Sequence, residues 1–121
     1  MMPLVWVAAG GALGASARYL VSTWMQTQDQ FPWSTLTINI AGSLCIGLAW
    51  GSWSHLAWFQ DWGRAFLVVG LLGGFTTFSA FSLETLALLQ LNKVGGAFGY
   101  VLASVAGCLL AAWLGQRLTS L

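Results

Sequence analysis

Apolar side chains fill four long runs of the sequence, and short segments richer in polar and charged side chains separate these runs. Crossing about 30 Å of hydrocarbon takes roughly 20 residues of α-helix, and each run is about that long or longer. The pattern therefore predicts an all-α integral membrane protein with four transmembrane helices. The predicted helices, all within one membrane domain of residues 1–121, cover residues 3–25, 34–53, 64–91 and 94–118.

The third run contains a sequence that disfavours a continuous helix near its middle. Gly73 and Gly74 are followed closely by Thr76 and Thr77. Glycine lowers helix stability by about 1 kcal/mol relative to alanine, and threonine hydroxyls compete for backbone hydrogen bonds. One interpretation is a helix broken near residues 74–77, whose exposed backbone groups can bind ions. The other is a glycine-rich contact between two continuous helices.

Composition places the chain in lipid and argues against catalysis. Only 6% of the residues are charged and 58% are hydrophobic, whereas a soluble domain carries about a quarter of its residues as charged side chains. The formal net charge is +1, and no basic run indicates nucleic acid as a partner. The three acids, one histidine and two cysteines are scattered, without a nucleophile beside a base or a metal-ligand spacing. We do not expect an enzyme.

Three polar side chains inside the runs need an explanation, and each has two. Arg18 either snorkels to the headgroups or faces the protein interior. An unpaired amide in lipid costs several kcal/mol, so Asn39 either bonds another helix or lines a conduit. Glu84 is either a snorkelling carboxylate or a paired one.

Two further patterns lie on the third and fourth predicted helices. Phe78 and Phe81 are three residues apart and share a face of the second half of the third helix. Tyr100, Ser104 and Cys108 recur every four residues and form a polar stripe on an otherwise apolar helix.

The basic residues divide evenly between the two sides of the membrane. Arg64 and Arg117 lie on the N-terminal side, Lys93 lies on the opposite side, and Arg18 is closer to that opposite side. Basic residues in cytoplasmic loops normally set the orientation, and here they favour neither one clearly. The balance predicts dual topology and an antiparallel homodimer, and a single orientation set by one or two charges is the alternative.

Three segments together resemble the signatures of the Fluc/CrcB fluoride channels: residues 10–19, 35–42 and 70–81. The resemblance covers the whole chain. It implies a multi-pass protein of the prokaryotic inner membrane that forms an antiparallel, dual-topology homodimer. Such a dimer lets toxic cytoplasmic fluoride leave passively through two pathways, which flank a central structural sodium ion.

The resemblance also assigns roles to residues. It implies that five side chains line the fluoride pathways: Asn39, Phe78, Phe81, Tyr100 and Ser104. It implies that the backbone carbonyls of Gly73 and Thr76, doubled by the dimer twofold, hold sodium. Arg18 and Glu84 stay structural or electrostatic candidates without a defined role. The sequence departs from the family pattern at Ala80, where threonine is usual, and at Cys108, where a hydroxyl residue is expected.

The chemistry of the assigned residues suits a small, strongly hydrated anion. The Asn39 amide and the hydroxyls of Tyr100 and Ser104 are neutral donors, which can replace hydration without holding the ion too tightly. Aromatic rings have electropositive edges, so Phe78 and Phe81 can meet an anion edge-on.

Two other classes of protein share some of these features. Small multidrug-resistance transporters are also short, four-spanning and antiparallel, but they couple protons through a glutamate in the first span. The first predicted helix here contains no acid and only Arg18 as a charge. A structural or assembly subunit without a pore would explain the glycines and the balanced charge, but not a helix break flanked by phenylalanines.

Overall fold

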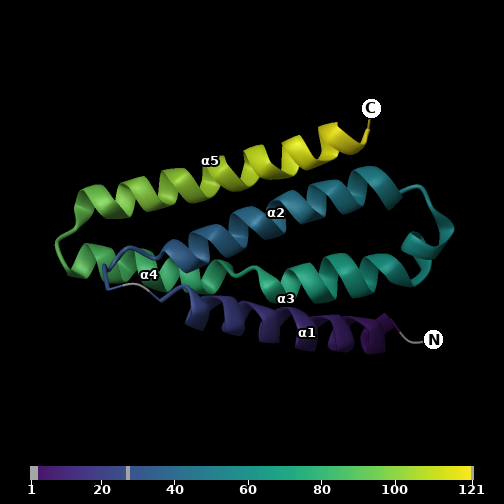
Figure 1. Cartoon of the computed structure of the whole chain (residues 1–121), viewed down its shortest axis with the longest axis horizontal. Coiled ribbons are helices and arrows are strands. Elements are labelled where there is room, and N and C mark those ends of the chain that lie inside the picture. The colour runs from purple at the N-terminus through teal and green to yellow at the C-terminus, as the bar shows by residue number, and fades with distance from the viewer. Residues whose placement is uncertain (1–2, 27, 121) are drawn as a thin grey trace.

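Four helical segments, each long and apolar enough to cross a membrane, run side by side in the computed structural model (Figure 1). The structure describes residues 3–26 and 28–120. Met1, Met2, Thr27 and Leu121, which the single-domain range 1–121 includes, lie outside the described residues. No β-strand occurs in the described part of the chain. The prediction of an all-α protein with four transmembrane helices is therefore confirmed.

The first, second and fourth membrane segments are single helices. They are α1 (Pro3–Trp24), α2 (Trp33–Trp53) and α5 (Val94–Thr119). The third segment, Phe59–Gln90, consists of three pieces. These are the π-helix η1 (Phe59–Leu72), the short α3 (Gly73–Phe75) and α4 (Phe78–Gln90). Successive segments cross in opposite directions, so the two ends of the chain lie at the same end of the bundle (Figure 1).

The third segment begins at Phe59, whereas the sequence predicted a start at residue 64. The Phe59 side chain is 1% exposed, and its ring makes an edge contact with Trp50 at 5.9 Å between centroids. The contact recruits Phe59 into the helix, although the composition around it resembles an interfacial loop. An aromatic contact thus joins the start of η1 to the last turns of α2.

Close backbone contacts at glycine join the helices in two pairs. An added Cβ at Gly10 would clash with the Phe66 carbonyl of η1, and one at Gly14 would clash with the Leu71 carbonyl. In the same way, Gly47 of α2 lies against the Ala112 carbonyl of α5. Small residues let helix backbones approach closely in lipid, where helices gain little by burying apolar surface. Here they fix α1 on η1 and α2 on α5.

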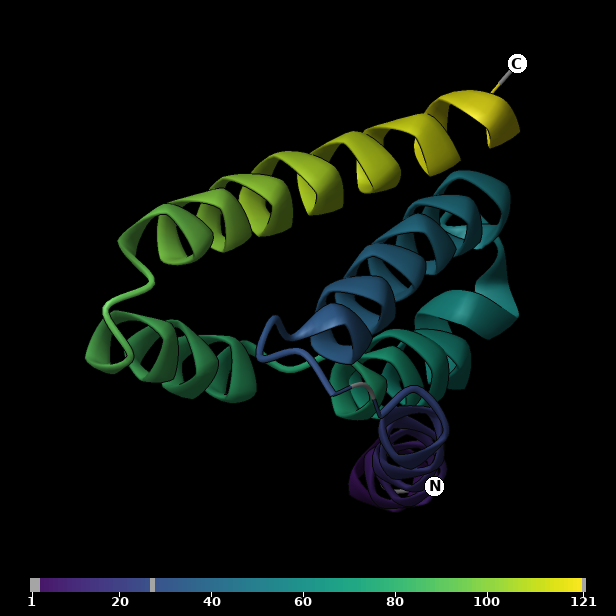
Figure 2. The same ribbon diagram turned by 60° about the vertical axis from the view of Figure 1, so that its left-hand side comes forward.

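Helix α4 turns away from α2 and packs beside the start of α5 (Figure 2). Asn92, with φ of 60°, makes the turn between them, a conformation that asparagine tolerates well. A small buried cluster holds α2, α4 and α5 together at this end: Leu36, Leu88, Ala97 and Tyr100. Most other large apolar side chains of α5 face outward, such as Phe98 at 71% and Leu102 at 70% exposed. They present an apolar surface suited to lipid.

The third segment is broken near its middle, as predicted. Gly73 and Gly74 remain helical, and the break falls on the two residues that follow Phe75. Thr76 (φ −85°, ψ 159°) and Thr77 (φ −152°, ψ 118°) are extended. The Thr76 N–H still donates to the Leu72 carbonyl of its own segment at 3.0 Å. The Thr77 backbone needs hydrogen-bond partners from outside its own helix.

Candidate functional site

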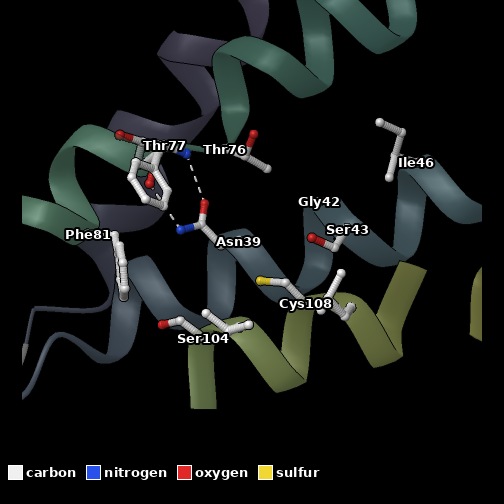
Figure 3. Close-up of a pocket in the computed structure, with 12 residues that line it drawn as sticks. Asn39, Gly42, Ser43, Ile46, Thr76, Thr77, Phe81, Ser104 and Cys108 are labelled. Atoms are coloured by element: carbon white, nitrogen blue, oxygen red, sulfur yellow. Dashed lines mark hydrogen bonds between the residues drawn. The ribbon is translucent and has the colours of Figure 1, made fainter. Parts of the chain in front are cut away.

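Asn39 of α2 supplies the partners for the broken backbone. Its Nδ2 donates to the Thr77 carbonyl at 3.1 Å, and its Oδ1 accepts from the Thr77 N–H at 2.8 Å. Figure 3 shows both bonds as dashed lines across the gap between α2 and the break. Asn39 thus bonds another segment of the chain, and it also lines a cavity. Of the two interpretations open from the sequence, the bond to another segment is confirmed, and a role in a conduit stays a prediction.

Thr77 caps the half-helix that follows. Its Oγ1 accepts from the Ala80 N–H at 3.1 Å, which is the usual hydrogen bond of a threonine at a helix N-terminus. The bond uses the backbone of residue 80. The alanine side chain at this departure from the family pattern leaves the cap intact.

The side chains of Asn39 and Thr77 each accept a hydrogen bond from a backbone N–H that would donate to a backbone carbonyl in a continuous helix. An α-helix pairs each carbonyl with the N–H four residues on. Gly73 would thus pair with the N–H of Thr77, and Thr76 with the N–H of Ala80. Those N–H groups donate to Asn39 and Thr77 side chains instead. Unwound carbonyls of this kind coordinate hard cations in membrane proteins, so the Gly73 and Thr76 carbonyls fit a sodium ion chemically.

Arg18 of α1 faces the interior. Its Nε donates to the Gly74 carbonyl at 3.1 Å, and the pair is partly buried. An added Cβ at Gly74 would lie 2.9 Å from the Gly11 carbonyl, so α1 approaches the break closely here. Arg18 therefore positions the end of α3, and of the two interpretations of this side chain the structure favours the interior one.

A cavity of about 390 Å³ lies between the break, α2 and α5. Its polar lining comes from all three: Asn39, Ser43, Thr76, Thr77, Ser104 and Cys108. Phe78 and Phe81 complete one wall. Figure 3 shows the Asn39 amide turned toward Thr77 at the break, with Ser104 and Cys108 on the α5 side of this space. The cavity gathers Asn39, Phe78, Phe81 and Ser104 of the predicted pathway residues.

The Ser104 hydroxyl is the unusual group in this cavity. The residue is 7% exposed, and its Oγ has no hydrogen-bond partner within the described residues. Buried hydroxyls in proteins are nearly always paired. The donor of this hydroxyl is therefore unused within the described part of the chain.

Phe78 and Phe81 form a short aromatic row that extends to Tyr100. The ring centroids of the two phenylalanines are 5.3 Å apart, and those of Phe81 and Tyr100 are 5.1 Å apart. Phe78 is 76% exposed on the single chain. The cavity wall is therefore open beside Phe78 unless another molecule covers it.

Glu84 is a paired carboxylate. Thr35 Oγ1 donates to one of its oxygens and the Tyr100 hydroxyl donates to the other, each at 3.0 Å. Tyr100 is fully buried and Thr35 is 4% exposed. The Tyr100 hydroxyl therefore serves Glu84 and lies beyond the main cavity, although the sequence grouped it with Ser104.

Two lining or supporting residues had not been predicted, Thr35 and Ser43. Together with Asn39 they recur every four residues along α2, which places them on one helix face. This stripe runs opposite the Tyr100, Ser104 and Cys108 stripe of α5. Polar spacing on α2 was thus the signal that could have revealed them.

Comparison with known proteins gives consistent results. The family model described as "CrcB-like protein, Camphor Resistance (CrcB)" matches residues 5–116. A protein named fluoride-specific ion channel FluC from Thermus thermophilus is 50% identical, covering 93% of this chain and 89% of that protein. FluC from Rhizobium meliloti is 42% identical over 98% of this chain and 96% of its own length. FluC 2 from Rhodococcus jostii is 43% identical, covering 98% of this chain and 100% of that protein.

Proposed function

The chain belongs to the CrcB family, and from this premise we propose that it is a fluoride-specific ion channel. It is a multi-pass protein of the plasma membrane, the inner membrane of a prokaryotic cell, and not an enzyme. As a passive channel it carries fluoride down its electrochemical gradient, which exports toxic cytoplasmic fluoride. The observation that carries the proposal is the membrane-depth cavity with the unpaired hydroxyl of Ser104.

Neutral donors in the cavity replace part of the hydration shell of fluoride. The Ser104 hydroxyl has no competing partner within the described residues. The Asn39 amide has two N–H bonds, and one of them donates to Thr77, which leaves the other for an ion. No charged side chain lines this cavity in the described part of the chain. An anion is therefore bound well enough to enter and weakly enough to leave.

The aromatic wall adds a weak positive field. The edges of Phe78 and Phe81 carry the positive part of the ring quadrupole. Their tilt of 46° relative to each other prevents face-to-face stacking and gives the row two ring edges in different directions. Beyond Phe81, Tyr100 donates to Glu84, so its hydroxyl can serve fluoride only by exchanging that partner.

The working unit in this proposal is an antiparallel homodimer with dual topology and two pathways. The exposed Phe78 and the open cavity beside it support a second copy as the missing wall. The even division of basic residues supports insertion in both orientations. A reporter fused to the C-terminus should then be detected on both sides of the membrane. A reporter found on one side only would contradict the antiparallel dimer.

A structural sodium ion at the dimer centre is part of the same proposal. The Gly73 and Thr76 carbonyls would hold it, since their helical donors are diverted elsewhere. When bound, the ion would supply positive charge beside the break. Arg18 donates to the neighbouring Gly74 carbonyl, so that third carbonyl already has a partner within the chain.

Fluoride efflux from proteoliposomes, read with a fluoride electrode, tests the function directly. The informative variant is Ser104→Ala. Removing a buried hydroxyl that lacks a protein partner should not lower stability, because no hydrogen bond is lost. We expect an unchanged unfolding midpoint together with efflux slowed by about tenfold, the effect of about 1.4 kcal/mol on a barrier.

Two controls accompany this experiment. Ser120→Ala removes an exposed hydroxyl that bonds its own helix, and it should transport like the unmodified protein. Chloride efflux measured on the same vesicles should stay near background. Absence of fluoride efflux from the correctly assembled, unmodified protein would refute the proposed function, and wild-type efflux in Ser104→Ala would remove Ser104 from the pathway.

A further inference from the structure

A second cavity, of about 310 Å³, lies at the end of the bundle where both chain termini are found. It lies between the last turns of α2, the first turns of η1 and the end of α5. Three of its lining side chains carry the argument: Trp50, Arg64 and Gln116. The proposed function gives this cavity no role so far.

The second cavity adjoins the first along α2. Ile46 lines both of them, and Ser43 and Trp50 lie one helical turn to either side of Ile46 on the same helix face. On α5, Cys108 lines the first cavity and Ala112, one turn on, lines the second. The two cavities therefore follow each other along one groove between the third segment and the α2–α5 pair, from the break to the end of the bundle.

Among the described residues that line this groove, Arg64 alone carries a charge. Its guanidinium lies 5.6 Å from the centre of the Trp50 ring. Stacking on an aromatic face restrains a guanidinium while its N–H edge stays able to bond an anion. Gln116 adds a neutral amide donor to the same cavity.

We propose that Arg64 and Gln116 form an anion-collecting mouth of the fluoride pathway on the side of the chain termini. This inference rests on the proposed channel function. A cation in a narrow mouth raises the local concentration of anions and the rate at which they arrive. Its position at the mouth matters, since a fixed cation beside Asn39 and Ser104 would hold the ion too tightly to release it.

Arg117 offers the matched control. It lies on α5 at the same end of the bundle and also stacks on a tryptophan, with its guanidinium 5.7 Å from the Trp113 ring. Arg117 is absent from the lining of both cavities. If both arginines only anchor the protein to lipid headgroups, replacing either one should have the same effect.

The test measures initial fluoride efflux of the full-length protein in vesicles of neutral lipid, at low and at high concentrations of an impermeant salt. The Debye length falls from about 30 Å at about 0.01 M to about 3 Å at about 1 M. We expect Arg64→Gln to slow efflux by about tenfold at low salt and to match the unmodified protein at high salt. Arg64→Lys should retain most of the rate, and Arg117→Gln should equal the unmodified protein at both salt concentrations.

A second variant adds charge to the cavity while leaving the Arg64–Trp50 stack in place. Gln116→Glu should slow efflux at low salt and recover at high salt. Equal efflux rates in Arg64→Gln and Arg117→Gln would overturn the proposed role of Arg64. A loss of efflux in Arg64→Gln and Gln116→Glu that does not depend on salt would overturn it as well. These results leave the channel itself intact, because its failure would appear as absent efflux in the unmodified protein.

Discussion

Asn39 performs two tasks in this structure, and two substitutions at this position test both of them. The side chain pairs with both backbone groups of Thr77, at 2.8 Å and 3.1 Å. It also lines the cavity through which fluoride is proposed to pass. Stability reports the first task and transport reports the second.

The stability effect follows from the bonds that each variant keeps. Asn39→Ala leaves the N–H and the carbonyl of Thr77 without partners, at about 1–3 kcal/mol for each group. Asn39→Asp still accepts from the N–H, but it orphans the carbonyl and places a carboxylate beside it, and the partly buried charge has a desolvation cost of its own. The unfolding midpoint in detergent should therefore fall in both variants. Ser43→Ala, one turn along the same helix and cavity wall, should keep the midpoint of the unmodified protein.

Transport separates the two variants. Two unit charges about 4 Å apart at an effective dielectric constant of about 20 interact by about 4 kcal/mol. A carboxylate at residue 39 should therefore slow fluoride by at least about a hundredfold, whereas alanine only removes a neutral donor. We expect Asn39→Asp to transport less than Asn39→Ala in efflux assays at equal amounts of folded protein. Unchanged midpoints in both variants would refute the pairing with Thr77, and equal transport by both would remove Asn39 from the path.

Three further predictions concern the two phenylalanines, the Tyr100–Glu84 pair and Cys108. Phe78→Leu and Phe81→Leu keep most of the apolar volume, so gel filtration should show an intact dimer while fluoride efflux falls by about a hundredfold; efflux at the unmodified rate in both would show that the rings only pack. Tyr100→Phe orphans one Glu84 oxygen in a buried site, which should lower the free energy of unfolding by about 1–3 kcal/mol; an unchanged unfolding curve would contradict the paired carboxylate. Cys108→Ser adds a hydroxyl donor to the cavity and should raise efflux without loss of stability, and slower efflux would mean that a donor at this position does not assist the ion.

The fold was predictable because lipid imposes simple constraints on sequence. Apolar runs of membrane length predicted four helices, and glycine beside threonine predicted the broken one. The site was only partly predictable, since pairing between segments depends on how the helices are rotated. Nothing local indicates that Asn39 faces Thr77, 38 residues on, or that Thr35 and Tyr100 share Glu84. The early start at Phe59 was missed for the same reason, because its contact with Trp50 is tertiary.

The dependence of the break on Asn39 has a consequence for how the chain is assembled in the membrane. Helix α2 is synthesised before the third segment, so Asn39 leaves the ribosome ahead of Thr77. In lipid, each unpaired backbone group of the break costs several kcal/mol. The third segment is therefore expected to settle at full depth only once α2 is beside it. We therefore expect the helices to assemble in chain order, because the second helix supplies the hydrogen bonds that the break in the third segment needs.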